Sequence, residues 1–234
     1  MRPLIFFISC LAISVATFAG IADGGIRGHL AITRVLTKQR VVLPAYPDRG
    51  VAAHSHNESA GAAPKIDNEW NRVVVFLESD SLSTPKPVTA TVSQSDERFD
   101  PDMVIVTAGS TVSFPNSDPI FHNVFSLSKV REFDLGYYPA GATRTVKFDK
   151  PGVVQVYCHL HPNMYASILV VPNNWYVRPS DQGNFEFSSI PPGNYQVVVW
   201  HKSAGLFRKR IQVTPGGVAS LSMEIPVGAN EPLP

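Results

Sequence analysis

Residues 158–164 read Cys-His-Leu-His-Pro-Asn-Met, and a histidine, His122, stands far upstream in Phe-His-Asn-Val-Phe. Cys158, His161 and Met164 follow one another as Cys-x2-His-x2-Met, so one short loop can present all three side chains. One thiolate, two imidazoles and one thioether are the ligand set of a mononuclear blue-copper site. The second imidazole has to come from a distant strand, which a β-sandwich allows. These four residues predict a copper ion and a β-sandwich together.

The rest of the chain also favours strands. It carries 20 prolines and 16 glycines, and 44% of its residues are apolar, so it can build a core connected by many turns. No segment has helical periodicity over three turns, which predicts an all-β fold. Strands are expected at residues 25–35, 72–78, 88–92, 103–107, 111–114, 143–148, 153–158, 165–171, 180–187, 196–200, 207–213 and 218–225. The apolar run at 72–78 predicts a strand buried on both faces.

The alternation of side chains along the expected strand at residues 153–158 predicts which way the Cys158 thiol points. Val154, Val156 and Cys158 fall on one face of the expected strand, so Cys158 is expected to point inward with two valines. Pro115 and Pro119 end the preceding ladder, because proline cannot donate to it. His122 follows directly after this break, where its side chain is available to a site at the end of the sandwich.

The thioether distinguishes copper from zinc. Structural zinc sites use thiolates and imidazoles, so a site that includes Met164 favours copper, with zinc or another copper geometry as the alternative. His159 follows Cys158 and should point away from the metal, as a surface or loop histidine. Its alternative role is an electron path to a second centre. The chain has only 7 histidines, too few for a multicopper oxidase.

Asn123, directly after His122, is a candidate for holding the two ligand segments together. Its side chain is expected to hydrogen-bond the backbone beside Cys158. The alternative is an ordinary turn asparagine.

Residues 1–22 are typical of a secretory signal: Arg2 precedes a long uncharged apolar run that ends in small residues. An uncleaved anchor is the alternative. Cleavage would remove one arginine and no acid, leaving equal numbers of basic and acidic side chains, so nothing favours nucleic acid or a membrane surface after cleavage. It would also remove Cys10 and leave Cys158 with no disulfide partner. We expect a periplasmic or secreted protein in which the Cys158 sulfur binds a metal.

The motifs Phe114-Pro-Asn-x-Asp, His122-Asn-Val-Phe and Val-Tyr-Cys158-x2-His161-x2-Met164 resemble those of the cupredoxins, and the short ligand loop is similar to that of amicyanin. The resemblance covers residues 88–172 and implies a Greek-key sandwich with type 1 copper near one end. In that family the loop histidine, here His161, is edge-exposed in an apolar patch where electrons are exchanged. Pro162 and Met164 would belong to that patch.

Residues 173–234 resemble a carboxypeptidase-regulatory or transthyretin-like module, through Gly183-Asn-Phe-Glu-Phe and Ile190-Pro-Pro-Gly-Asn-Tyr. This implies a second, Ig-like sandwich. Its missing strands would come from residues 23–87, which also contain a loop rich in Pro and Ala, so the copper domain would be an insertion. The whole arrangement is similar to exported proteins called methylamine-utilisation proteins.

Three functions follow from these observations. The first is a carrier of single electrons that works with a redox partner protein. It is not an enzyme, because four protein ligands leave no open metal position for a substrate. The second is a protein that stores or delivers copper. The third is a partner- or glycan-binding module in which copper only stabilises the fold.

Overall fold

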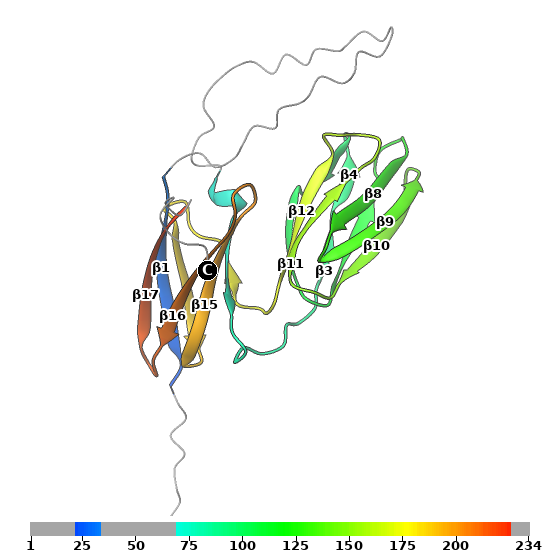
Figure 1. Ribbon diagram of the computed structural model, residues 1–234. Helices are drawn as coiled ribbons and strands as arrows, with labels where there is room; N and C mark the ends of the chain where they lie inside the picture. The colour runs from blue at the N-terminus through cyan, green and yellow to red at the C-terminus, as the bar shows by residue number, and fades with distance from the viewer. Residues whose placement is uncertain (1–21, 34–68, 226–234) are drawn as a thin grey trace, which may run out of the picture.

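The computed structural model describes residues 22–33 and 69–225, which form two β-sandwiches side by side (Figure 1). Within these ranges the one helical segment is a 3-10 turn, η2 (Trp70–Arg72). The predicted all-β fold is confirmed. The expected signal at 1–22 and the loop within 34–68 lie outside the described residues, apart from Ala22. No helix among the described residues is long and apolar enough to cross a membrane.

We call the first unit the outer sandwich. Its strands are β1 (Gly24–Ile32), β2 (Val73–Glu78), β13 (Tyr176–Val177), β14 (Asn184–Ile190), β15 (Gly193–His201), β16 (Gly205–Val213) and β17 (Val218–Ile225). One sheet has the order β14-β1-β17 and the other β13-β2-β15-β16. Their inner faces share one apolar core, which includes Ile26, Val75, Phe187 and Val197.

We call the second unit the site sandwich. Its strands are β3 (Thr89–Thr91), β4 (Ser93–Ser95), β5 (Arg98–Asp100), β6 (Met103–Thr107), β7 (Ser110–Pro115), β8 (His122–Ser128), β9 (Arg131–Tyr138), β10 (Thr143–Phe148), β11 (Gly152–Tyr157) and β12 (Tyr165–Val171). A sheet of order β10-β7-β3 faces one of order β6-β12-β11-β8-β9, and β4 and β5 form a separate hairpin. The core between the facing sheets contains both Cys158 and Met164.

The chain enters the site sandwich after β2 and leaves it after β12. The strands before and after this segment of the chain pair with one another in the outer sandwich. β1 lies between β14 and β17, and β2 lies between β13 and β15. The site sandwich is therefore inserted into the outer one (Figure 1).

The two sandwiches share an apolar contact. The side chains of β2 alternate between the core of the outer sandwich and this contact. Val73, Val75 and Leu77 belong to the outer core. Val74 and Phe76 face the site sandwich. The shared cluster is completed by buried side chains of both units: Val198, Trp200, Met103, Leu169 and Val171. This double burial explains the unbroken apolar run at residues 73–77.

Two hairpins were not expected from the sequence. β8 pairs with β9, and β4 pairs with β5. β9 lies at a sheet edge and is half exposed, and β4 and β5 have three residues each, so neither hairpin has a long apolar pattern. Both border the predicted ligands.

Candidate metal centre

Cys158 lies one residue beyond the end of β11. Val154 and Val156 of that strand are fully buried, and Cys158 is buried in the same core. The alternation of the strand thus carries the thiol inward, to one end of the site sandwich. Cys158 has no disulfide partner among the described residues.

Two backbone hydrogen bonds close the loop from Cys158 to Met164. The Cys158 N–H donates to the Met164 carbonyl oxygen at 3.2 Å, and the Met164 N–H donates to the His161 carbonyl oxygen at 3.0 Å. The loop is therefore a tight turn between β11 and β12. The side chains of Cys158 and Met164 both contribute to the buried core.

His122 begins β8 and is fully buried beside this loop. Its Nδ1 lies 3.9 Å from the Cys158 Sγ, and the Nδ1 of His161 lies 3.8 Å from the same sulfur. The two imidazole centroids are 4.8 Å apart, with planes at 64°. Three donors around one ion at bond lengths of about 2.0–2.3 Å lie about 3.5–4.0 Å from one another in a trigonal plane.

The structure thus brings His122, Cys158 and His161 together as a possible metal site, their donor atoms all within 4.8 Å of one another. Met164, the fourth expected ligand, is buried in the core beside Cys158. The donor set of one thiolate and two imidazoles suits a soft transition metal.

Asp118, which the sequence analysis named only as the last residue of the Phe114-Pro-Asn-x-Asp motif and gave no role, contacts one of these imidazoles. The Nε2 of His122 lies 2.7 Å from the Oδ2 of Asp118, and both side chains are buried. Burial by itself raises the pKa of Asp118, but hydrogen bonds from the Glu97 N–H, His122 and the Asp96 N–H outweigh it and hold that pKa below its ordinary value. The sequence feature that could have indicated this contact is the position of Asp118, four residues before His122 in the Asn-Ser-Asp-Pro segment.

Asn123 does not make the expected hydrogen bond to the backbone beside Cys158. Its Nδ2 donates to the Asp134 Oδ1 at 2.7 Å, and its Oδ1 is buried without a hydrogen-bond partner. The β8–β9 pairing brings Asp134 opposite this segment, and a charged acceptor is a stronger partner than a neutral one. The N–H of Gly136 and the amide of Asn123 lower the pKa of Asp134, against the effect of burial, and His159 adds to this.

His159 lies on the outside of the sheet, as alternation after Cys158 predicts. Its ring stacks on Phe125 with centroids 3.8 Å apart and planes at 4°, and its Nε2 lies 3.5 Å from the Asp134 Oδ2. It is not among the clustered donors of the possible metal site.

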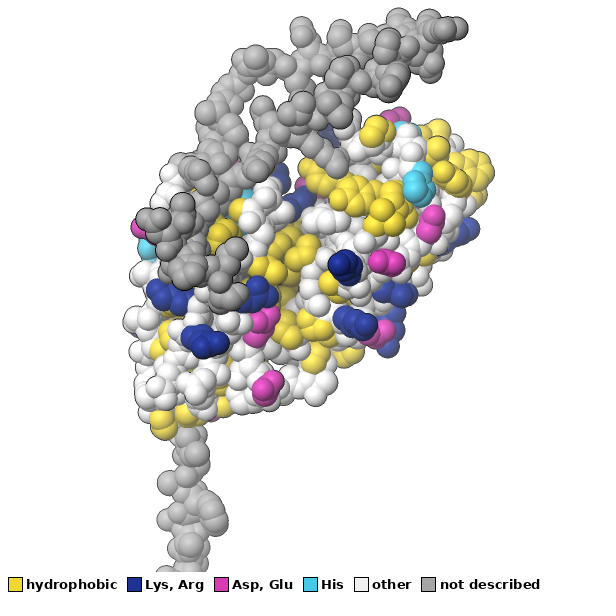
Figure 2. All heavy atoms as spheres, in the orientation of Figure 1, with side chains coloured by type: hydrophobic (Ala, Val, Ile, Leu, Met, Phe, Trp, Pro, Cys, Tyr) yellow, Lys and Arg dark blue, Asp and Glu magenta, His cyan; other side chains and the backbone are white. Residues whose placement is uncertain are grey.

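Apolar side chains are exposed next to the ligands in sequence. Ile120 and Phe121 precede His122, and Leu160 precedes His161. His161 itself is half-buried and Pro162 is exposed. Hydrophobic side chains gather over the upper part of the site sandwich (Figure 2). His161 is therefore the ligand candidate nearest to solvent.

No protein-family model matches the chain, and no curated protein matches it. Among solved structures, a purple cupredoxin from Nitrosopumilus maritimus is 21% identical, with a TM-score of 0.33 over 35% of this chain and 99% of that one. A reduced amicyanin variant is 21% identical, with a TM-score of 0.33 over 41% and 99%. A copper-containing nitrite reductase from Thermus scotoductus is 23% identical, with a TM-score of 0.35 over 40% of this chain and 25% of that one.

Proposed function

We propose that this chain is an exported electron carrier that binds one copper ion. His122, Cys158 and His161 would supply the trigonal donors, and Met164 the weak axial one. The observation that carries the proposal is the separation of 3.8 and 3.9 Å between the Cys158 sulfur and the two Nδ1 atoms. Copper in such a set supplies one-electron redox chemistry.

The surroundings of the donors support the proposed electron transfer. His122, Cys158 and Met164 are buried, so these three side chains are kept from water. Because hydrogen bonds hold the loop and His122, little has to move when the charge of the site changes. The edge of His161, between exposed Leu160 and Pro162, is the proposed contact with a redox partner protein.

The test is the optical and paramagnetic resonance spectrum of the purified protein after copper is added. We expect an intense visible thiolate-to-copper band that disappears on reduction and returns on oxidation. Cys158→Ser should abolish the band, whereas His159→Ala, the matched control, should keep it because His159 stacks outside the sheet.

Two results would contradict the proposal. Loss of the band in His159→Ala would show that the ligand assignment is wrong. Rapid loss of copper to a chelator, without a stable redox cycle, would instead show a protein that delivers copper. Periplasmic export is tested separately, by the N-terminal sequence of the mature protein.

A further inference from the structure

The hairpin of β4 and β5 ends in a turn at Asp96 and Glu97. Both residues have positive φ, 53° and 54°, a backbone region that residues other than glycine seldom occupy. Their N–H groups both donate to Asp118, at 2.7 Å to Oδ1 and 3.0 Å to Oδ2. The turn thus holds a buried carboxylate through two successive backbone donors.

The same carboxylate determines which nitrogen of His122 carries the proton. An ionised carboxylate can only accept hydrogen bonds, so Nε2 of His122, 2.7 Å from Asp118 Oδ2, must be the donor. In the neutral imidazole, which carries a single N–H, the Nδ1 facing the Cys158 sulfur is then the unprotonated nitrogen. A metal ligand nitrogen has to be unprotonated, and the bond made by the other ring nitrogen fixes this.

Further bonds hold the hairpin and Asp118 in register. The Asp118 N–H donates to the Asn116 Oδ1 at 3.0 Å, and the Ser117 N–H donates to the Gln94 carbonyl oxygen at 2.9 Å. Gln94, in β4, is itself buried and donates to the Tyr138 hydroxyl. The carboxylate is therefore fixed from both sides.

The hairpin tip also reaches the second imidazole. The Glu97 Oε2 lies 3.9 Å from the Nε2 of His161, too far for a direct hydrogen bond. His122 is thus held rigidly through Asp118, whereas His161 is restrained only weakly at its solvent edge.

We propose that Asp118 is a positioning residue, which the β4–β5 hairpin holds so that His122 is the Nε2–H tautomer with Nδ1 turned to the metal. The identity of the metal rests on the proposed function, but the tautomer does not. The pocket would be prepared for the metal before any metal arrives.

The first test uses the metal-free wild-type protein and needs no variant. Long-range proton–nitrogen correlation spectra near neutral pH report the tautomer of each histidine. We expect His122 to be the Nε2–H tautomer. A Nδ1–H tautomer, or rapid averaging between the two, would overturn the proposal.

The second test compares Asp118→Asn with Asp134→Asn, whose carboxylate contacts the non-ligand His159. An amide accepts through one of its two atoms only, so at least one of the three donors loses its partner in Asp118→Asn. We expect Cu(I) affinity to fall about 10–100-fold in Asp118→Asn and to stay within about twofold of wild type in Asp134→Asn.

Equal losses in the two variants, or wild-type affinity in Asp118→Asn, would overturn the positioning role. If the wild-type protein bound no copper, the proposed function would fail, while the spectra of the metal-free protein would still decide the tautomer. If Asp118→Asn did not fold, the wild-type spectra would again decide.

Discussion

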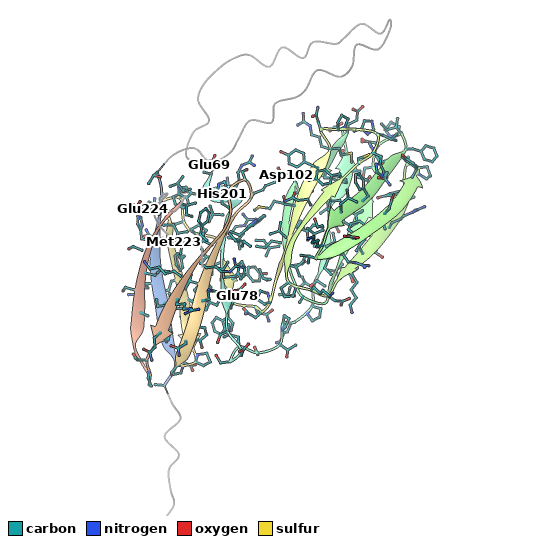
Figure 3. The ribbon with its side chains drawn as sticks, in the orientation of Figure 1. Glu69, Glu78, Asp102, His201, Met223 and Glu224 are labelled. Carbon is teal, nitrogen blue, oxygen red and sulfur yellow. The ribbon has the colours of Figure 1, made fainter. Side chains whose placement is uncertain are left out.

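Lys202 of the outer sandwich places its ammonium group against the carboxylate of Asp102 in the site sandwich. Asp102 is labelled in Figure 3. The lysine side chain is only 4% exposed, whereas that of Asp102 is 56% exposed. The ammonium also lies 5.3 Å from the ring centroid of Tyr165, the residue after Met164. Burial lowers the pKa of Lys202, although Asp102 opposes this effect.

This unequal burial predicts unequal effects of removing either partner. Asp102→Asn should destabilise the protein by about 1–3 kcal/mol, because a buried ammonium loses its charged acceptor. Lys202→Met should change stability by less than about 1 kcal/mol, since the exposed carboxylate becomes hydrated and the apolar chain still fills the space. Urea unfolding measures both, and a larger loss in Lys202→Met would contradict this.

Trp200 is the largest side chain in the apolar contact between the sandwiches. It is almost fully buried against side chains of both units. Trp200→Ala should cost about 3–5 kcal/mol and should split thermal unfolding into two transitions, one for each sandwich. Val218→Ala, at an exposed position of β17, is the control and should change stability by no more than about 0.5 kcal/mol.

The buried pair of His201 and Glu69 should make stability depend on pH (Figure 3). His201 Nδ1 accepts hydrogen bonds from the N–H groups of Ser203 and Ala204, so protonation there would break both. Burial lowers the pKa of His201, although Glu69 acts in the opposite direction. The unfolded chain therefore binds a proton at higher pH than the folded protein does.

The stability contributed by neutral His201 is complete above about pH 6.5, the ordinary histidine pKa, and declines below it toward the lowered value in the fold. We expect the melting temperature to fall between about pH 7.5 and about pH 5.5, with a smaller fall in His201→Gln. The control His29→Gln removes an exposed histidine. An equal fall in wild type and His201→Gln would exclude His201 as the source.

Met164→Leu tests the proposed axial donor. Leucine fills a similar volume in the core but offers no sulfur, so the variant should fold and keep copper on the other three residues. The reduction potential should rise, since the axial ligand tunes it. Cyclic voltammetry measures the change; an unaltered potential would mean that the Met164 sulfur does not contact the metal.

The bounds of several strands were predictable from the sequence. β6, β10 and β12 begin and end at the expected residues, and the inward direction of Cys158 follows from alternation with Val154 and Val156. A distant strand was expected to carry His122, but the bounds of β8 and its pairing with β9 at the edge of the sheet were not predicted. β9 is exposed or half-exposed over most of its length and mixes charged with apolar residues, so it resembles a loop in sequence.

Around the possible metal site, the predicted residues His122, Cys158 and His161 are the ones that the structure brings together, but their spacing did not show which other side chains they contact. Asp118 is one of 19 acidic residues, and only the folded hairpin brings the Asp96 and Glu97 N–H groups to it. Asn123 was singled out by its place after His122, but its partner is Asp134, which the unexpected β8–β9 pairing supplies. Such contacts depend on tertiary structure rather than on spacing.

The insertion of one sandwich into the other has a consequence for the order of folding. Within its sheet β1 pairs with β14 and β17, near the far end of the described chain, whereas every sheet of the site sandwich is closed within residues 89–171. Contacts between segments distant in sequence form slowly because a long loop has to close first. We expect the site sandwich to reach its native state while β1 is still unpaired. A newly made chain would then form its possible metal site before the outer sandwich is complete, and the unpaired edges of β1 would be open to pairing with other chains during that interval.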